Sequence, residues 1–180
     1  MLIREATAAD WPGMWTVIEP IIRAGETYTY PTDSSEEGMR SEWLPAESLE
    51  HDAGAPARAI RSYVVTEETG GNSAPMIVAT AQLHPHHSGA GSHIANAAFM
   101  VHRDHEGKGY GTLLAHHVLD AARADGYTAM VFNAVVESNE GAVRLWQSLG
   151  FEILATIPGA FEHPAQGPVG LHLMYKALAT

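Results

Sequence analysis

The chain has 180 residues, 46% of them hydrophobic, and a net charge of −11 from 21 acidic and 10 basic residues. This length supports one substantial core and is short for two ordinary domains, so one domain over residues 1–180 is expected. An acidic surface repels polyphosphate, which argues against nucleic acid as a partner. The chain has no cysteine, which excludes disulfides and thiolate catalysis, and its apolar runs are too short to cross a bilayer. With charged Arg4 and Glu5 where a secretion signal would be apolar, a cytoplasmic protein is expected.

The periodicity of apolar residues predicts a mixed α/β sheet. In chain order the expected elements are a strand at residues 2–6, a helix at 10–22, a second helix that begins at Ser34 or Ser35 and is interrupted around Pro45, strands at 61–67, 76–83 and 94–101, a helix at 109–124, a strand at 128–136, a helix at 139–149, and strands at 151–157 and 169–178. Asp10 is the expected N-cap of the first helix. A turn at 70–73 should join two strands as a hairpin, and a loop containing Pro and Gly should separate the last two strands.

The most informative segment connects the strand at 94–101 to the helix at 109–124. Gly107, Gly109 and Gly111 stand there at alternate positions, where a backbone that approaches a ligand closely must lack side chains. The helix that follows presents unpaired N–H groups and its positive dipole end, which suits a diphosphate. A tight turn without a ligand would use the same glycines. Two other phosphate motifs are excluded, because Walker A needs Ser or Thr after Lys108 and the dinucleotide fingerprint needs G-x-G-x-x-G.

A second motif begins at Asn139. Its apolar residues lie on one helix face, namely Ala142, Leu145, Trp146 and Leu149. Gly150 suits the left-handed position after a helix, so Phe151 can pack back on Trp146. The two motifs in this order resemble the GCN5-related N-acetyltransferase (GNAT) family, whose coenzyme A pyrophosphate loop reads R/Q-x-x-G-x-G/A and whose later helix reads N-x-x-A-x-x-L-Y-x-x-x-G-F. The element order agrees over nearly the whole chain.

The resemblance implies an α/β fold in a single domain, with a mixed and mostly antiparallel sheet, a splayed parallel strand pair and flanking helices. It implies transfer of an acetyl group from acetyl-CoA to the amine of a small molecule, by direct attack without a covalent enzyme intermediate. The residues implied for binding acetyl-CoA are Phe99, Met100 and Val101 in one splayed strand, Gly107, Lys108, Gly109, Gly111 and Thr112 in the loop, and Asn139 in the later helix. A backbone N–H near Val101 would stabilise the thioester oxygen.

A narrower resemblance concerns the enzymes that N-acetylate proline analogues such as azetidine-2-carboxylate, and it is carried by Asn96, Asn133 and Asn139. It implies that Asn96 and Asn133 orient the acceptor amine, from strands that are otherwise apolar and therefore expected to be buried. Glu137 is the candidate base, with a solvated loop residue as the alternative. The acceptor is expected against the segment Gly25–Tyr30, whose hydroxyl groups could hold a small polar molecule.

Two residues depart from the family pattern. Glu106 stands where the family has Arg or Gln, so diphosphate binding would rest on backbone N–H groups together with Lys108 and Arg103. Trp146 stands where the family often has a tyrosine that protonates the departing thiolate. An indole N–H can hydrogen-bond the sulfur but cannot ionise usefully, so the proton would come from solvent or from the substrate.

Histidines at positions 84, 86, 87 and 93 lack helical ligand spacing, so no metal is expected. The histidines at 102, 105, 116 and 117 are expected at the surface. Other readings remain open: acetylation of an antibiotic or a polyamine, or a non-catalytic coenzyme A sensor on the same scaffold. The sequence also leaves open whether the chain forms a homodimer.

Overall fold

The computed structural model describes residues 1–45, 60–68 and 75–178. Its strands are β1 (Leu2–Glu5), β2 (Arg61–Glu67), β3 (Met76–Pro85), β4 (Ile94–Val101), β5 (Ala129–Val136), β6 (Glu152–His163) and β7 (Gly167–Ala177). Its α-helices are α1 (Trp11–Ala24), α2 (Glu36–Trp43), α4 (Tyr110–Ala124) and α5 (Glu140–Ser148), and short 3₁₀ helices lie at Ala8–Asp10, Gly89–Gly91 and Arg103–His105.

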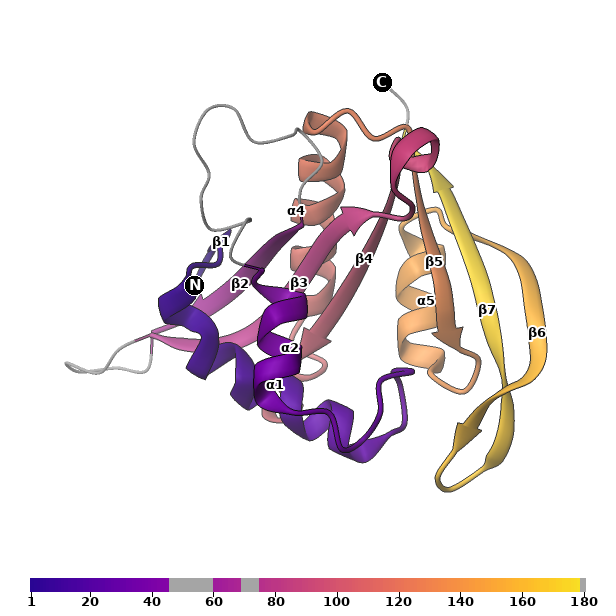
Figure 1. Cartoon of the computed structure of the whole chain (residues 1–180), viewed down its shortest axis with the longest axis horizontal. Coiled ribbons are helices and arrows are strands. Elements are labelled where there is room, and N and C mark those ends of the chain that lie inside the picture. The colour runs from indigo at the N-terminus through magenta and orange to yellow at the C-terminus, as the bar shows by residue number, and fades with distance from the viewer. Residues whose placement is uncertain (46–59, 69–74, 179–180) are drawn as a thin grey trace.

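The strands form one sheet in the order β1-β2-β3-β4-β5-β7-β6. β4 and β5 run parallel, and the other neighbouring strands run antiparallel. α1 and α2 cover one face, while α4 and α5 cover the other (Figure 1). The predicted mixed, mostly antiparallel sheet with flanking helices is therefore confirmed.

Alternating side chains of the strands divide the core between the two faces. In β2, Tyr63 and Val65 pack in the cluster that contains Leu114 of α4. Val64 between them packs in the cluster that contains Met14 of α1. Each of these five side chains is at most 1% exposed. The sheet is thus buried on both faces where the helices cover it.

β4 and β5 separate soon after they begin. Their parallel ladder consists of Ile94 opposite Ala129 and Ala95 opposite Met130. Beyond Ala95, β4 keeps its pairing with β3, and β5 keeps its pairing with β7. The sheet therefore splits between two central strands, and beyond Ala95 the backbone groups of β4 that face β5 have no ladder partner.

Two details near the first helix differ from expectation. Asp10 does not cap α1 with its side chain. Its carboxylate instead accepts hydrogen bonds from Arg4, at 2.7 Å, and from the backbone N–H and hydroxyl of Thr7. An arginine that reaches the carboxylate bidentately is a stronger partner than a backbone N–H. Ser35, by contrast, is the N-cap of α2, and it accepts a hydrogen bond from Gly38.

The last two strands are longer than predicted. β6 continues through Pro158 and Gly159, which the sequence predicts to lie in a loop, and pairs with β7 up to His163 opposite Gly167. The register shifts between Ile157 and Phe161, around Pro158. An edge strand tolerates such an irregularity, because proline cannot donate a backbone hydrogen bond to the ladder. The predicted turn at 70–73 lies outside the described residues. Within the described part of the chain, every helix is too short or too polar to cross a membrane.

Candidate active site

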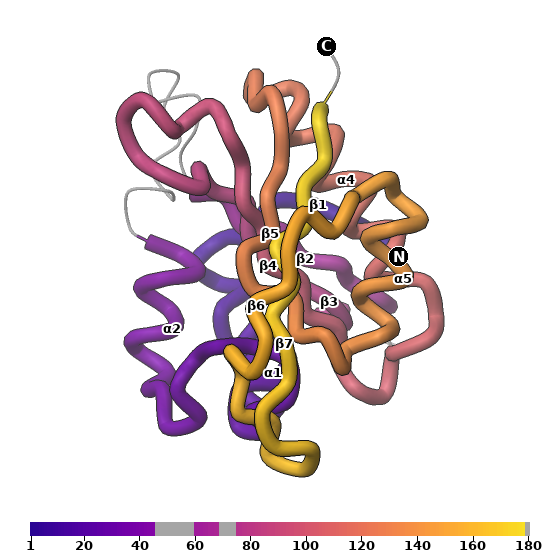
Figure 2. The backbone as a smooth tube through the Cα atoms, turned by 90° about the vertical axis from the view of Figure 1, so that its right-hand side faces the viewer, coloured from indigo at the N-terminus to yellow at the C-terminus, as the bar shows by residue number. Residues whose placement is uncertain are grey.

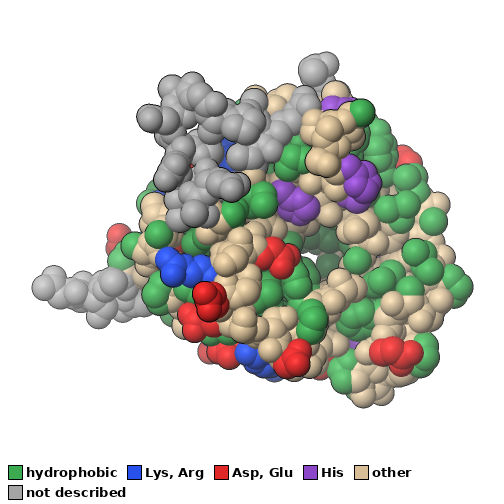
Figure 3. Space-filling view, in the orientation of Figure 1, with side chains coloured by type: hydrophobic (Ala, Val, Ile, Leu, Met, Phe, Trp, Pro, Cys, Tyr) green, Lys and Arg blue, Asp and Glu red, His purple; other side chains and the backbone are tan. Residues whose placement is uncertain are grey.

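A cavity of about 930 Å³ opens where β4 and β5 part. Figure 3 shows the surface hollowed between the region of α1 and α2 and the region of β5 to β7, with histidines along one rim. Most of its lining comes from the segment after α1 (Glu26 to Tyr30), β4 (Asn96 to Val101), the loop into α4 (His105 to Thr112, without Lys108), the end of β5 and the first half of α5. Ile21, Glu42, Gln82 and His84 complete the lining.

The loop into α4 has the backbone shape that an anion site needs. Gly107 and Gly109 both adopt positive φ, at 71° and 86°, and Gly109 is the N-cap of α4. No side chain caps that helix, and the first helical bond runs from the Leu113 N–H to the Gly109 carbonyl. A Cβ added at Gly107 or Gly109 would meet no atom within 4 Å. The space beside the two glycines is therefore open, and the N–H groups before Leu113 have no partner within α4.

Fewer positive charges face this loop than the sequence suggested. Glu106 lines the cavity, as predicted, but Lys108 is exposed and does not belong to the lining. Arg103 points to Glu26, with 3.7 Å between the guanidinium and the carboxylate. The predicted role of Lys108 and Arg103 toward a diphosphate thus finds no support in the geometry, and the helix N-terminus is left as the main anion-binding feature.

His105 lines the cavity, although the sequence suggested a surface position. Its side chain is 14% exposed, and its Nδ1 lies 3.2 Å from the Glu67 carboxylate without hydrogen-bond geometry. The other oxygen of Glu67 accepts a hydrogen bond from the Tyr110 hydroxyl at 2.7 Å. Glu67 belongs to β2, so no local pattern in the sequence could have revealed this group.

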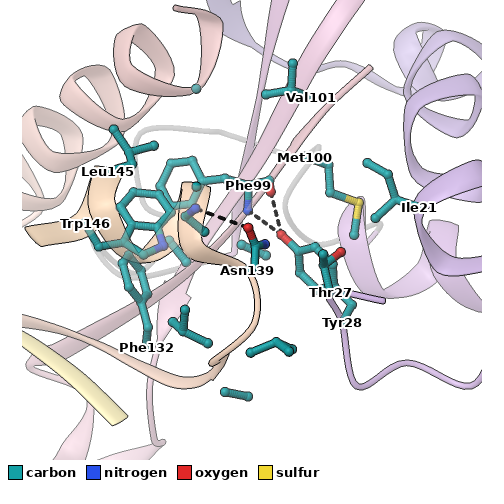
Figure 4. A pocket seen from close by; sticks show the side chains of 18 of the residues that line it. Ile21, Thr27, Tyr28, Phe99, Met100, Val101, Phe132, Asn139, Leu145 and Trp146 are labelled. Carbon is teal, nitrogen blue, oxygen red and sulfur yellow. Dashed lines mark hydrogen bonds between the residues drawn. The ribbon is translucent and has the colours of Figure 1, made fainter. Parts of the chain in front are cut away.

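The wall along β4 is shown in Figure 4. Phe99, Met100 and Val101, which the sequence assigned to acetyl-CoA binding, all line the cavity. The Phe99 backbone carries an unexpected partner: its N–H donates to the Tyr28 hydroxyl at 3.0 Å, and that hydroxyl donates to the Phe99 carbonyl at 2.5 Å. Asn139, on the opposite side, caps α5 by accepting a hydrogen bond from the Ala142 N–H at 3.2 Å. Its amide nitrogen is then the atom available to a ligand.

Trp146 belongs to an aromatic cluster that closes the cavity on the α5 side. The indole ring is 7% exposed, and its centroid lies 4.8 Å from that of Phe99 and 4.7 Å from that of Phe132. Phe151 packs on it as predicted, at 5.9 Å, and the Phe151 N–H bonds to the Trp146 carbonyl. Trp146 therefore supplies an apolar wall in addition to its N–H.

Asn96 and Asn133 face each other across the split. The Asn96 amide donates to the Asn133 side-chain oxygen at 3.4 Å, and the Ala97 N–H donates to the Asn96 side-chain oxygen at 2.8 Å. Both asparagines line the cavity, but the expected burial is wrong: Asn96 is half-buried and Asn133 is exposed. The reason is that the ladder between β4 and β5 ends just before these residues.

Glu137 lies apart from the other predicted residues. It does not line the cavity, and its carboxylate accepts a hydrogen bond from the Gly170 N–H of β7 at 3.0 Å. The Glu137 N–H also bonds to the Gly170 carbonyl. Glu137 is exposed in a turn and has a partner 33 residues away, which supports the alternative of a solvated loop residue rather than a role as base.

The far end of the cavity holds polar groups that the sequence did not single out. Glu42 of α2 accepts a hydrogen bond from Tyr30 at 2.8 Å, and its backbone carbonyl accepts one from Gln82. Burial, and then the Glu42 carboxylate, raise the pKa of the Tyr30 hydroxyl. His84 also lines this end, and its Nδ1 lies 2.8 Å from the Pro85 carbonyl. Thr27, Tyr28 and Thr29, from the segment that the sequence assigned to the acceptor, also line the cavity.

The charged side chains that line the cavity are acidic. Among the described residues that line the cavity, Glu26, Glu42 and Glu106 are acidic, and none is lysine or arginine. The described residues also contain no group of three or more His, Cys, Asp or Glu side chains placed to hold a metal ion.

Comparisons with known proteins agree with this geometry. A solved structure of a GCN5-related N-acetyltransferase from Kribbella flavida is 38% identical, with a TM-score of 0.85, over 98% of this chain and 96% of that one. YncA of Salmonella typhimurium, solved with its cofactor acetyl-CoA, is 24% identical, with a TM-score of 0.81, over 100% of this chain and 95% of that one. This second likeness bears on the fold alone.

The curated relatives match over a shorter stretch. The L-amino acid N-acyltransferase MnaT of Escherichia coli is 42% identical over 67 residues, which are 37% of this chain and 38% of MnaT. The chain thus spans about a third of the length of the curated relatives it matches, 32% and 38%. The model of the acetyltransferase (GNAT) family matches residues 17–151, three quarters of the chain, including β4, the glycine loop and α5. The chain therefore belongs to the GNAT family of acetyltransferases.

Proposed function

We propose that this chain transfers an acetyl group from acetyl-CoA to the amine of a small molecule, with an amino acid or a proline analogue as acceptor. The observation that carries the proposal is one continuous cavity, which runs from the uncapped N-terminus of α4 along the open edge of β4 to polar groups at its far end. Such a cavity has room for a long phosphorylated thioester at one end and a small amine at the other.

The residues present fit acetyl-CoA. Gly107 and Gly109 leave open space beside the loop, so a diphosphate can approach the N–H groups and the dipole at the start of α4. Val101 and Asn139 lie along the split, where amide groups of a pantetheine arm would find hydrogen-bond partners. When bound, acetyl-CoA supplies the activated acyl group. The aromatic cluster around Trp146 keeps water from that group, which limits hydrolysis.

The acceptor nitrogen needs orientation and must be unprotonated to attack. Asn96 and Asn133 can position it by hydrogen bonds. His84 has the chemistry of a base: because the Pro85 carbonyl can only accept, the neutral His84 ring carries its proton on Nδ1 and leaves Nε2 as an acceptor. We propose His84 in the role that the sequence suggested for Glu137.

Two acceptor classes have support. The similarity to MnaT, an L-amino acid N-acyltransferase, favours an amino acid or a proline analogue. The acidic lining favours instead a cationic amine such as a polyamine, because Glu26 and Glu42 would attract it and an amino-acid carboxylate meets no lysine or arginine among the described lining residues. The amide donors of Asn96 and Asn133 remain for that carboxylate.

A thiol-release assay tests the proposal with little background. Because the chain has no cysteine, a thiol reagent reports free CoA alone. The purified chain would receive acetyl-CoA with proline, azetidine-2-carboxylate, primary L-amino acids or spermidine. We expect thiol release that depends on the amine, and an acetylated product by mass spectrometry. Binding of acetyl-CoA without release for any amine would favour a sensor, and absence of binding would contradict the proposal altogether.

Variants assign the acceptor side. We expect Asn96→Ala and Asn133→Ala to lower kcat/KM for the amine by roughly ten- to a thousandfold, with little change in KM for acetyl-CoA. Gln147→Ala removes an exposed amide outside the cavity and is the control. Glu42→Gln distinguishes the two acceptor classes, since it should lower kcat/KM for a cationic amine and leave kcat/KM for an amino acid unchanged. Equal amine kinetics in both asparagine variants would remove the support for this placement.

We also propose that a second copy of the chain pairs along β6. This edge strand is exposed at Glu152 to Ala160 and carries Ile153, Leu154 and Ile157 at the surface. Figure 2 shows β6 and β7 together on the outer side of the molecule. An edge strand has unpaired backbone N–H and C=O groups that can bond to another strand. Two copies of one strand can pair antiparallel about a twofold axis. A cytoplasmic location stays a prediction from the sequence.

A further inference from the structure

The Tyr28 hydroxyl lies on the backbone of β4 in the middle of the split. Tyr28 belongs to the segment between α1 and α2 and reaches Phe99, 71 residues later in the chain. Its oxygen accepts a hydrogen bond from the Phe99 N–H at 3.0 Å and donates its proton to the Phe99 carbonyl at 2.5 Å. In Figure 4 the phenol approaches Phe99 from the side opposite Trp146. Both residues line the cavity.

The register of β4 explains why these backbone groups are available. The His102 N–H bonds to the Val78 carbonyl, and the Ile94 carbonyl accepts from the His86 N–H. Even-numbered residues of β4 therefore direct their backbone groups toward β3, and odd-numbered residues such as Phe99 direct theirs away from it. On that side β5 has already left the ladder. The Tyr28 hydroxyl thus occupies a position that a neighbouring strand would otherwise fill.

A thioester that is attacked by an amine needs a hydrogen-bond donor to its carbonyl oxygen. Negative charge develops on the carbonyl oxygen, and fixed donors in a site without bulk water stabilise it most effectively. Trp146 and Phe132 provide no hydroxyl on the other side of the split. We propose that the Tyr28 hydroxyl, held in place by the Phe99 N–H, donates its hydrogen bond to the thioester oxygen; the proposal rests on the proposed acetyl transfer.

The arrangement requires only rotation of the hydroxyl proton. The Tyr28 oxygen stays on the Phe99 N–H, and its proton turns from the Phe99 carbonyl toward the thioester oxygen. The amine nitrogen then forms its bond to the carbonyl carbon, and the C=O electron pair moves onto oxygen. When that pair returns, the C–S bond breaks and sulfur leaves with its electrons. The proton lost by the amine finally reaches sulfur through the base and water, and Tyr28 keeps its own proton.

A role as hydrogen-bond donor fits Tyr28 better than a role as acid. Burial raises the pKa of its hydroxyl to about 12, so the phenol stays protonated and available as a donor. Full transfer of its proton to a thiolate, whose conjugate thiol has a pKa near 8.5, would be uphill by about a thousandfold. Hydrogen-bond donation needs no such transfer. The Phe99 N–H also polarises the hydroxyl and strengthens the bond that it can donate.

Kinetics of Tyr28→Phe give the first test, with Tyr175→Phe as the control, since Tyr175 lies in β7 outside the cavity lining. We expect kcat to fall by about a hundred- to a thousandfold, the effect of removing one oxyanion donor. The dissociation constant of CoA, measured by calorimetry, should change by less than about threefold, because the thioester is absent from that ligand. Tighter acetyl-CoA binding with unchanged kcat would show that the hydroxyl only blocks the Phe99 N–H, and would overturn the proposal.

A spectroscopic test does not depend on turnover. The carbonyl stretch of acetyl-CoA labelled with ¹³C at the thioester is measured by infrared difference spectroscopy on the full chain. A donated hydrogen bond lowers this frequency, so we expect a lower value in the wild type and in Tyr175→Phe than in Tyr28→Phe. Equal frequencies would overturn the proposal even if the enzyme is active. A shift that is present without acetylation of any amine would retain the Tyr28 contact and reject the proposed function. A large loss of melting temperature with equal frequencies would assign Tyr28 to bracing β4.

Discussion

At the scale of single residues, Gly109 meets two requirements of the loop that a residue with a side chain would not meet. It begins α4 with a φ of 86°, a conformation that residues with a Cβ rarely adopt, and it leaves the helix N-terminus without a covering side chain. With Lys108 exposed and Glu106 acidic, the backbone has to supply most of the attraction for a diphosphate. The affinity for acetyl-CoA should therefore depend on this glycine more than on any lysine.

We expect Gly109→Val to abolish measurable binding of acetyl-CoA in calorimetry. Valine at positive φ also costs roughly 1–2 kcal/mol in the free energy of unfolding. Gly159→Val is the matched control, because Gly159 has a φ of 62° but lies in β6, far along the chain from the loop. Both variants should melt at lower temperature, and only Gly109→Val should lose the ligand. Wild-type affinity in a folded Gly109→Val variant would refute the assignment of the loop.

The candidate site was predictable from the sequence where a residue acts through its own local motif. Gly107 and Gly109 lie in the loop that leads into α4 and Asn139 is the N-cap of α5, so local spacing was enough to predict that they come together at the cavity. Partners from distant strands were not predictable. The Glu137 carboxylate is held by Gly170, and His105 meets Glu67, and neither pair leaves a trace in local sequence.

At the scale of elements, apolar runs predicted strands well where both faces of the sheet are covered. β2 and β4 begin and end at the predicted residues, and each contains an apolar stretch, Tyr63 to Val65 in β2 and Ala97 to Val101 in β4. β6 was predicted too short, since its nine residues from Glu152 to Ala160 are exposed and follow no burial pattern. Pro158 and Gly159 usually mark a loop, and an edge strand tolerates them. Asp10 stands at the N-cap position of α1 as predicted, but its carboxylate binds Arg4, six residues earlier, instead of a backbone N–H of the helix.

The contact between Arg4 and Asp10 joins β1 to the start of α1 and should make stability depend on pH. The Arg4 guanidinium lowers the pKa of Asp10 from 3.8 to about 2. A carboxyl group with a depressed folded pKa stabilises the fold above its unfolded pKa, and this contribution disappears as the pH falls from about 4 toward 2. Arg4 is 39% exposed, so solvent screening reduces the contribution to about 1 kcal/mol.

Urea unfolding of the wild type and of Asp10→Asn between pH 6 and pH 3 measures this contribution. We expect the difference in the free energy of unfolding to be constant near pH 6 and to shrink below about pH 4. Arg4→Gln removes the partner and should show the same loss at pH 6. A difference that stays constant down to pH 3 would contradict the ion pair as its source.

At the scale of the whole molecule, the two edges of the sheet differ in how they are protected. β1 is an edge strand of four residues, whereas β6 is an edge strand of twelve. Short edge strands are one way in which proteins avoid unwanted pairing, and long apolar ones need a cover. The cavity lies between these edges, at the split of β4 and β5, and none of the described residues of β6 lines it.

We therefore expect the wild type to sediment as a dimer of 19.3 kDa chains, and the double variant Leu154→Lys with Ile157→Lys to sediment as a monomer. Leu154 and Ile157 are 56% and 57% exposed on β6, and lysine on an edge strand disfavours pairing by its charge and its solvation. The matched control is Leu2→Lys, at 58% exposure on the opposite edge strand, which should leave the mass unchanged. Sedimentation velocity at several concentrations measures the masses, and melting temperature verifies that each variant is folded. A wild type that stays monomeric, or a dimer that survives both lysines, would contradict pairing along β6. Retained thiol release in the monomeric variant would further show that each active site is complete within one chain.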